Sequence, residues 1–408
     1  MPQLAKRKYC TGCMSCMDAC PRQAISIRRE YSIPFPFVDT NACVDCQLCE
    51  RVCPIVTPQR KNRVEDMRVY GGWAKDDKIR YNGASGGAFG GLAITFIKEH
   101  IGLSSVYGAT LENNHVYHKR ITTFEEVPML MNSKYIQSET VGIWKNIKDD
   151  LKQGYWVLFS GTPCQVAALY AYLGKERNHE RLLTIEVVCH GVASQEVLDI
   201  HLQHFHSKKI YSFRNKEEGQ GWSTSQCTTI EHNGHSYRFK RKDDVFYKIF
   251  ASWLLDRKSC SNCQYSSLNR VADITLADFW GGARDFREYE RGVNVIVANN
   301  SKADAFVRGS KDLEVYGSTL YKAINSNPNF YNGYKYIQYH PFVLWTNFSR
   351  KIIPRRLWLQ IVENRMPWKI FWAVYKVMTI LHVKRRKKLI ERQYGNILHE
   401  WLSGGVQY

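Results

Sequence analysis

Short apolar runs alternate with longer amphipathic stretches between residues 69 and 300 of this chain. Apolar runs of about four to eight residues are typical of buried strands, and longer stretches with helical spacing are typical of helices. The pattern predicts strands over 69–74, 105–109, 155–160, 183–188 and 293–298, and helices over 85–99, 139–152 and 163–174. A hairpin is expected within 224–239, because Asn233-Gly234 is a strong pair for a two-residue turn. This alternation favours an α/β or mixed sheet core.

Two cysteine-rich runs near the N-terminus share one spacing. Each reads C-x2-C-x2-C-x3-C-P, the spacing with which bacterial ferredoxins hold two [4Fe–4S] clusters. Three cysteines in so short a loop face one cluster, and the fourth, on the segment that leaves the loop, ligates the other. We therefore predict one cluster on Cys10, Cys13, Cys16 and Cys53, and another on Cys43, Cys46, Cys49 and Cys20. This pattern predicts a protein that moves electrons.

Zinc and disulfide bonds are the alternatives for these cysteines. Zinc usually takes two C-x2-C pairs per ion without the trailing C-P. Disulfides need an oxidising compartment, and no signal peptide precedes Cys10, so a cytoplasmic location is expected. Both alternatives therefore agree less well with the spacing than iron–sulfur clusters do.

Composition places the chain among soluble globular proteins. Hydrophobic residues make up 44% and charged residues 23%, which argues against a disordered chain. Bound clusters reduce the formal net charge of +19, because each cubane with its four thiolates carries about −2. The remaining charge suits ferredoxin or another acidic redox partner, or a membrane surface. No nucleic-acid recognition motif accompanies it.

A second set of cysteines lies in the main part of the chain. Cys164 and Cys189 each follow a predicted strand, which would bring them to one rim of a sheet, and Cys260 and Cys263 form a C-x2-C pair. These four are candidates for a third [4Fe–4S] cluster, with zinc as the alternative. Cys227 lies within the predicted hairpin and is expected to be an ordinary buried thiol.

A glycine-rich segment at residues 83–87 leads into the predicted helix over 85–99. Glycines let the backbone approach a ligand, and the free N–H groups of a helix N-terminus attract phosphate. Close packing of the helix on the sheet is the alternative explanation. Neither a G-x-G-x-x-G fingerprint nor a P-loop is present, so a nicotinamide site of the Rossmann type is not expected.

Five motifs follow one another in the order SGG, SKYIQS, GTPCQ, CHG, and the C-x2-C pair with ADITLADFWG after it. In this order they resemble the coenzyme F420 hydrogenase/dehydrogenase beta-subunit family, over roughly residues 69–300. Proteins of this family carry FAD next to a [4Fe–4S] cluster and pass electrons between iron–sulfur clusters and a small redox partner. The resemblance implies that Cys164, Cys189, Cys260 and Cys263 hold that cluster. It also implies that the flavin lies near Ser85, Gly86, Gly87, Lys134, Tyr135 and Thr162.

Several side chains near these motifs have two interpretations. Lys134 would neutralise charge on a reduced flavin or on its phosphates, or else be a surface lysine. His190 would donate a hydrogen bond or a proton near the flavin, or else orient the Cys189 loop. Asp273 and Asp278 are expected to hold the segment after the C-x2-C pair, and Trp280 to shield a cofactor or to pack in the core.

The expected fold class is α+β, with four parts along the chain. Residues 1–58 form a bacterial-type ferredoxin domain with a loop around Pro34 and Pro36, and the charged residues 59–68 form a linker. Residues 69–340 form a mixed α/β domain that binds flavin and a cluster. Residues 341–408 form a basic, aromatic helical segment. Within that segment, the apolar stretch 367–381 is too short and too charged to span a bilayer.

The resemblance implies a flavin-dependent iron–sulfur oxidoreductase with three clusters and FAD. It would pass electrons between a ferredoxin-like donor or coenzyme F420 and a small-molecule substrate. One alternative is a non-catalytic electron-transfer subunit that docks on a separate catalytic protein. Another is a reductase of a glycan precursor that lies at the inner face of the membrane. It would touch the membrane through residues 365–390, an aromatic helix followed by a basic run. The opposing interpretation is a terminal helix packed on the protein body.

Overall fold

The computed structural model describes most of the chain up to residue 331. The described residues are 1–331 without 31–32, 217–221, 223–227, 240–242 and 253–255, and further along 341, 345, 349, 353, 361, 367–374, 377–378 and 381. Cys227 lies outside the described residues, as does most of the basic segment expected after residue 340.

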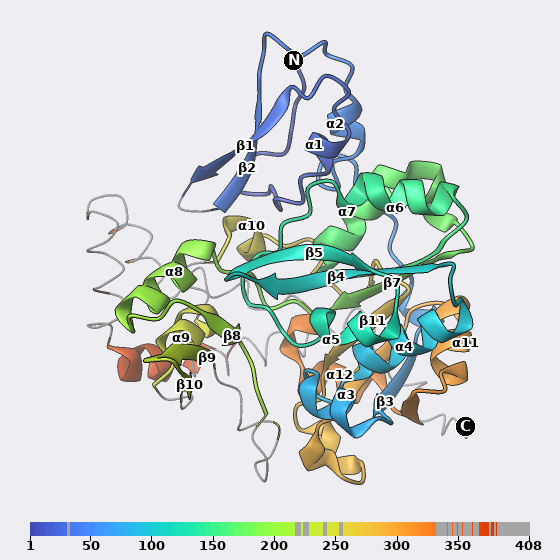
Figure 1. Ribbon diagram of the computed structural model, residues 1–408, viewed down its shortest axis with the longest axis vertical. Coiled ribbons are helices and arrows are strands. Elements are labelled where there is room, and N and C mark those ends of the chain that lie inside the picture. The colour runs from blue at the N-terminus through green and yellow to red at the C-terminus, as the bar shows by residue number, and fades with distance from the viewer. Residues whose placement is uncertain are drawn as a thin grey trace.

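A mixed eight-stranded sheet forms the centre of the molecule, in the order β13-β3-β12-β11-β7-β6-β4-β5 (Figure 1). Its strands are β3 (Arg68–Ala74), β4 (Ser104–Glu112), β5 (His115–Ile121), β6 (Trp156–Gly161), β7 (Leu182–Val187), β11 (Ile274–Asp278), β12 (Asn294–Ala298) and β13 (Leu313–Gly317). Strands β4, β6, β7 and β11 are parallel neighbours, and the outer strands pair antiparallel. The carboxyl ends of β6, β7 and β11 therefore meet at one edge, where open α/β sheets bind their ligands.

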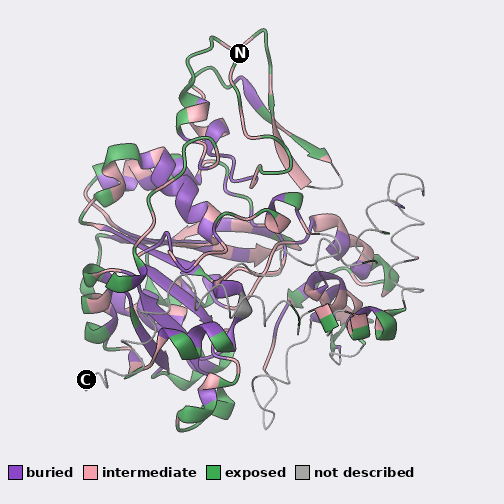
Figure 2. Cartoon of the chain, turned by 180° about the vertical axis from the view of Figure 1, so that it is seen from behind, coloured by how far each residue is buried: buried purple, intermediate pink, exposed green. Residues whose placement is uncertain are grey.

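Helices cover both faces of this sheet. Helices α4 (Ala88–Glu99) and α11 (Ser301–Gly309) pack on one face in one apolar cluster. Helices α6 (Ile143–Lys152) and α7 (Pro163–Leu173) pack on the other face, and α12 (Leu320–Ser326) packs in a further cluster beside β3 and β12. Buried residues accordingly concentrate in the strands and in the inner sides of these helices (Figure 2).

The hydrophobic pattern predicted most of these elements to within a few residues. Helix α4 begins at Ala88, three residues after the expected start, because 83–87 form a turn with Gly87 at φ 72°. Helix α6 begins at Ile143, four residues after the expected start. Strands β5, β11 and β13 were not predicted. Strand β5 (HVYHKRI) has too few apolar residues for a buried run, yet it pairs along its length with β4.

A smaller lobe follows the third parallel strand. It contains α8 (Gln195–His204), the strands β8 (Ile210–Ser212), β9 (Thr229–His232) and β10 (His235–Arg238), and α9 (Val245–Ala251). The turn between β9 and β10 is the predicted Asn233-Gly234 pair, with φ 51° and 78°. Phe371, which is fully buried, packs into this lobe together with Trp368 and Trp372.

The N-terminal module has short helices and one hairpin. Its elements are α1 (Ser15–Asp18), β1 (Ile25–Glu30), β2 (Ile33–Val38) and α2 (Leu48–Arg51). The loop expected around Pro34 and Pro36 is wrong, because both prolines lie in β2, opposite Arg29 and Ile27 of β1. Proline is tolerated there because a two-stranded sheet has an edge that needs no backbone donor.

The module is docked on the main part of the chain through the backbone of its first cysteine loop. The carbonyl of Cys13 accepts hydrogen bonds from Thr140 Oγ1 and Trp144 Nε1, each at 2.8 Å. Gln137 Nε2 donates to the Thr11 carbonyl at 2.9 Å. Asp18 accepts from the backbone N–H groups of Gly142 and Trp144, so a residue of the module caps helix α6.

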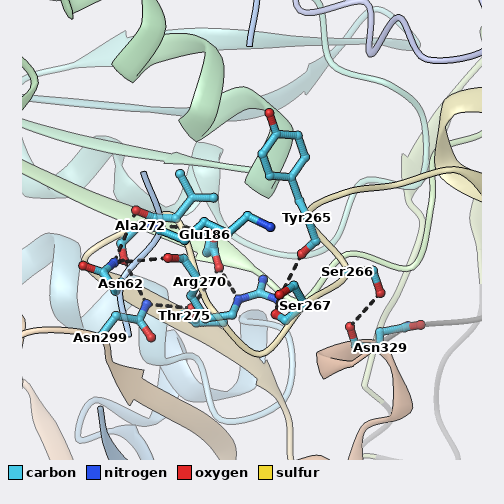
Figure 3. A network of polar contacts seen from close by, with 12 residues as sticks. Asn62, Glu186, Tyr265, Ser266, Ser267, Arg270, Ala272, Thr275, Asn299 and Asn329 are labelled. Atoms are coloured by element: carbon cyan, nitrogen blue, oxygen red, sulfur yellow. Dashed lines mark hydrogen bonds and ion pairs between the residues drawn. The ribbon is translucent and has the colours of Figure 1, made fainter. Parts of the chain in front are cut away.

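The expected linker over 59–68 packs closely on the main sheet. Its Val64 and Met67 are each 1% exposed, and Asn62 Nδ2 donates to the Ala272 carbonyl at 2.8 Å. Asn62 thereby joins a buried polar network centred on an ion pair between Glu186 of β7 and Arg270 (Figure 3). This network fixes the segment that connects the C-x2-C pair to strand β11.

Breaking the buried ion pair should destabilise the whole protein. Glu186 is fully buried and also accepts from Thr275 Oγ1 at 3.0 Å, so Glu186→Gln leaves the Arg270 guanidinium without a counter-charge. We expect a loss of about 3–5 kcal/mol in the free energy of unfolding, measured by urea denaturation. Glu180→Gln, at an exposed glutamate, is the control and should change it by less than about 0.5 kcal/mol. Equal effects of the two substitutions would contradict the role given to the network.

Candidate redox site

The first cysteine set gathers in the N-terminal module beside the main sheet. Cys13 and Cys16 are buried, and burial is the main reason that the pKa of Cys13 is raised to about 11. The charges of Cys53 and Cys10 raise the pKa of Cys13 further. The pKa of Cys16 is likewise raised first by burial and then by the charges of Cys13, Cys10 and Cys53, and also by that of Cys49 from the second set. The structure thus brings Cys53 to the other three in spite of its distance in sequence.

The second run of the module lies farther from the main sheet (Figure 1). Cys49 is buried, and its charge interacts with that of Cys46, which is exposed. Cys20 packs with Cys49 in the small core of the module, and its sulfur accepts a hydrogen bond from Ala24 N at 3.3 Å. Cys43 is half-buried at the start of this run.

The third set comes from three separate segments. Cys164 lies in the first turn of α7, just after β6, and Thr162 Oγ1 is 3.1 Å from its sulfur. Cys189 follows β7, and Cys260 lies in the short helix α10 (Lys258–Ser261), three residues before Cys263.

Charge interactions show that these four thiols lie close together. The Cys189 thiol has a pKa raised first by burial and then by the charges of Cys164 and Cys263. The pKa of Cys260 is raised first by burial, then by the charge of Asp256, and then by those of Cys189, Cys263 and Cys164. Thiols that burial keeps protonated become thiolates when a cation binds them, so this donor set suits iron.

Within the described part of the chain, no three His, Cys, Asp or Glu side chains converge tightly enough to hold a single metal ion. A cubane places its four irons at separate corners, and each thiolate ligates a different iron. Four thiols can therefore hold a cluster without converging on a single point.

A cavity of about 1760 Å³ opens beside the third cysteine set. Its wall includes all four of those cysteines, and also Lys134, Tyr135 and Thr162. The Tyr135 ring stacks on Phe250, with ring centroids 4.2 Å apart. His190 also lines the cavity, and burial lowers its pKa to about 3, which keeps the imidazole neutral.

The glycine segment contributes to the cavity in part. Gly87 lines it, whereas Ser85 and Gly86 are outside its described lining. Ser85 is fully buried, and its Oγ donates to the Val293 carbonyl at 2.5 Å. A Cβ on Gly86 would lie 2.8 Å from the Gly72 carbonyl oxygen of β3. These two residues therefore have packing roles that hold the segment against the sheet.

Lys134 is half-buried and lines the cavity, in contrast to a lysine that extends freely from the protein surface. Burial lowers its pKa to about 7, and its Nζ donates to the Met131 carbonyl. The nearby His118 is buried, with a pKa lowered to about 4 for the same reason. A negative ligand in the cavity would favour the charged form of Lys134 and raise its pKa again.

The residues after the C-x2-C pair hold the sheet edge together. Asp273 accepts from the Thr184 backbone N–H and hydroxyl, both at 2.9 Å, and Asp278 forms an ion pair with Arg214 at 3.0 Å. Trp280 lines the cavity and packs against Trp222, with ring centroids 4.7 Å apart and the ring planes tilted by 32°. Sequence reasoning did not find Arg214, a buried cavity residue, because no motif surrounds it.

Comparisons with known proteins agree with the order of these motifs. Residues 155–317 match the family described as the C terminus of the coenzyme F420 hydrogenase/dehydrogenase beta subunit, and residues 9–56 match the 4Fe-4S dicluster domain. The resemblance to that family, with a dicluster ferredoxin module at the N-terminus, is therefore confirmed. The dicluster match also supports [4Fe–4S] clusters in this module.

Two relatives are subunits of oxidoreductases. One subunit of the F(420)H(2) dehydrogenase of Methanosarcina mazei is 25% identical over 193 residues, which cover 45% of this chain and 53% of that protein. One subunit of the H(2):CoB-CoM heterodisulfide,ferredoxin reductase of Methanothermobacter marburgensis is 27% identical over 82 residues, 17% of this chain and 12% of that protein. The chain thus spans about half of the first protein and a small part of the second.

A chain of the F420-reducing [NiFe] hydrogenase complex from Methanosarcina barkeri matches the structure with a TM-score of 0.45 and 15% identity. The match covers 69% of this chain and 93% of that chain.

We expect Lys134→Met to stabilise the protein purified without added cofactors, and most strongly at low pH. The pKa of Lys134 is about 7 when it is buried and 10.5 ordinarily, so the unfolded chain binds more protons between these pH values. The free energy of unfolding of the wild type should therefore rise between pH 7 and pH 10.5, by roughly 1.4 kcal/mol per pH unit. Below about pH 7 the full cost of burying the charge is present.

Urea unfolding at about pH 6 and about pH 9 tests this prediction. The gain from Lys134→Met should be larger at the lower pH, whereas Lys152→Met, at an exposed lysine, should show no such difference. The same gain at both pH values would show that burial does not lower the pKa of Lys134.

Proposed function

We propose that this protein is an iron–sulfur flavoprotein oxidoreductase. It passes electrons between a ferredoxin-like donor or coenzyme F420 and a small-molecule substrate, through three [4Fe–4S] clusters and FAD. One observation carries the proposal. Four thiols from three separate segments meet at the wall of a cavity, and the first cysteine loop of the ferredoxin module packs against the same edge of the sheet.

Three cysteine sets are proposed as cluster ligands. In the module these are Cys10, Cys13, Cys16 and Cys53 for the inner cluster, and Cys43, Cys46, Cys49 and Cys20 for the outer one. The third set is Cys164, Cys189, Cys260 and Cys263. The inner set is the one next to the main domain, because the charge of Cys13 is among those that act on Cys164. The order of the sets gives a path from the surface of the module to the cavity.

The cavity fits a flavin in shape and in charge. Gly87 precedes the twelve-residue helix α4, whose N-terminus favours a phosphate, and the Lys134 ammonium supplies a positive charge. Tyr135 presents a flat aromatic wall, and Thr162 lines the cavity beside Cys164, with its Oγ1 3.1 Å from the cysteine sulfur. The neutral His190 imidazole can donate one hydrogen bond toward the flavin. FAD would supply the conversion between single electrons and the electron pairs that organic substrates accept.

For the division of the chain we propose the boundaries that the sequence predicts. These are the module 1–58, the connecting segment 59–68, the catalytic domain 69–340 and the C-terminal segment 341–408. The alternative function is that of a non-catalytic protein that delivers electrons to a separate catalytic partner. Its docking would use the positive surface of the chain against an acidic partner.

Transfer from the clusters to the flavin can be followed directly. When reduced ferredoxin is mixed with the protein without oxygen, the flavin absorbance should bleach, and Cys263→Ser should slow this step at least tenfold because it removes a ligand of the third cluster. Bleaching of the module clusters should stay fast. Cys227→Ser is the matched control, because Cys227 is not a proposed ligand. Unchanged flavin reduction in Cys263→Ser would contradict the proposed path.

A peripheral membrane contact is a second proposal, supported by the outer side of the segment around residue 370. Phe371 is buried against the small lobe, whereas Ile370, Val377 and Leu381 are 58%, 59% and 63% exposed. In the sequence a basic run follows at 384–388. Apolar side chains beside a basic run suit the surface of an anionic membrane. Among the described residues, no helix has the length and apolar character needed to cross a bilayer.

Binding to anionic vesicles tests this contact. We expect the double substitution Ile370→Ser and Val377→Ser to weaken binding by about tenfold or more, because two apolar side chains lose their burial in the membrane. Ile101→Ser is the control, because Ile101 is 77% exposed in the turn that follows helix α4, away from this segment in sequence. Equal binding of both variants would exclude this surface as the membrane contact.

A further inference from the structure

One buried arginine lies between the first and the third cysteine sets. Arg257 is 2% exposed, and its backbone belongs to the main domain, where its carbonyl accepts from Cys260 N at 2.9 Å and its N–H donates to Val192 O at 3.3 Å. Its side chain extends into the N-terminal module. There Nη1 donates to the Pro34 carbonyl at 3.0 Å, and the guanidinium lies 4.7 Å from the centre of the Phe35 ring.

The guanidinium also lies against the first cysteine loop. Gly12 stands between Cys10 and Cys13 with φ 69°, and a Cβ built on it would lie 2.6 Å from Arg257 Cζ. The loop can therefore approach the guanidinium this closely only because residue 12 has no side chain. The C-x2-C-x2-C-x3-C-P motif does not specify residue 12, because it fixes only the cysteines and the proline.

No carboxylate in the described part of the chain pairs with Arg257, and its Nε has no hydrogen-bond partner there. Burial lowers the pKa of Arg257, and the negative charges that raise it belong to Cys10, Cys260, Cys164 and Cys13. Guanidinium stays charged in proteins, and a buried charge without a counter-charge is very costly. The negative charges that act on the guanidinium thus come from two cysteines of each set.

We propose that Arg257 is the shared counter-cation of the inner module cluster and the third cluster, and that it raises the reduction potential of both. This inference rests on the proposed function, because it needs a cluster on each cysteine set. Each cluster with its thiolates is an anion that gains one negative charge on reduction, so a fixed cation nearby favours the reduced form. The low dielectric of the interior makes this effect larger than it would be in water.

The step that Arg257 serves is the transfer of one electron between the two sites. One electron leaves the reduced cluster on Cys10, Cys13, Cys16 and Cys53, and the oxidised cluster on Cys164, Cys189, Cys260 and Cys263 takes it up. No bond forms or breaks, and Arg257 keeps its protons. Because the same cation acts on donor and acceptor, it raises both reduction potentials and leaves the difference between them largely unchanged. Arg257 therefore acts only through its fixed positive charge. It does not carry the electron, and it takes no part in making or breaking bonds.

The test is a redox titration of the complete protein, followed by electron paramagnetic resonance. In Arg257→Gln we expect the ratio of reduced to oxidised cluster at a fixed potential to fall about tenfold for both clusters, a shift of about 59 mV to lower potential for one electron. The outer module cluster should shift much less. Arg257→Lys keeps a positive charge and should shift the ratio by less than about threefold.

The matched control is Arg177→Gln. Arg177 is half-buried where the main domain meets the N-terminal part, donating to Gln59 Oε1 at 3.1 Å, but no cysteine is among the charges that act on it. Arg177→Gln should leave the reduction potentials of all three clusters unchanged. Unchanged potentials in Arg257→Gln would overturn the inference. If Arg257→Gln loses iron, Arg257→Lys provides the test. A tenfold change in its ratio of reduced to oxidised cluster would show that packing matters and charge does not, and would overturn the inference.

The count of irons separates this inference from the proposed function. About eight irons per wild-type chain would remove the third cluster and with it the proposed function. About twelve irons with unaltered potentials in Arg257→Gln would overturn only the role of Arg257.

Discussion

The architecture depends on one contact, the docking of the first cysteine loop on the main domain through its backbone carbonyl groups. Thr140 and Trp144 both donate to the carbonyl of Cys13, and Gln137 donates to that of Thr11. In return Asp18 of the module caps helix α6 of the main domain. Buried backbone groups must be paired, so these bonds fix the angle at which the module meets the sheet. That angle is what brings one ferredoxin cysteine set next to the cavity.

From this contact, the parallel strands explain the remainder of the site. Strands β6 and β7 are parallel neighbours, so the segments that follow them, with Cys164 and Cys189, emerge at the same edge. The C-x2-C pair reaches that edge from a different part of the chain, and the network around Glu186 and Arg270 holds the segment that follows it (Figure 3). A site assembled from three segments is therefore rigid without being local in sequence. Such rigidity suits electron transfer, because it keeps the distances between cofactors fixed.

The sequence predicted the parts of the site that local spacing determines. Both C-x2-C-x2-C-x3-C-P runs, the Asn233-Gly234 turn and most strands followed from short-range patterns. The loop at Pro34 and Pro36 was wrong because a proline in an edge strand looks the same in sequence as a proline in a loop. The burial of Arg257 and Arg214 and the place of Lys134 in the cavity wall could not be predicted, because each depends on segments that are distant in sequence. From sequence alone a charged residue is predicted to be exposed, because most charged residues are.

The iron, acid-labile sulfide and flavin content of protein purified without oxygen tests the central claim most directly. The account predicts about twelve irons, about twelve sulfides and one FAD per chain, with an absorption spectrum of clusters and flavin together. About eight irons and no flavin would contradict it. The protein would then be a dicluster ferredoxin joined to a domain whose four converging thiols serve another purpose.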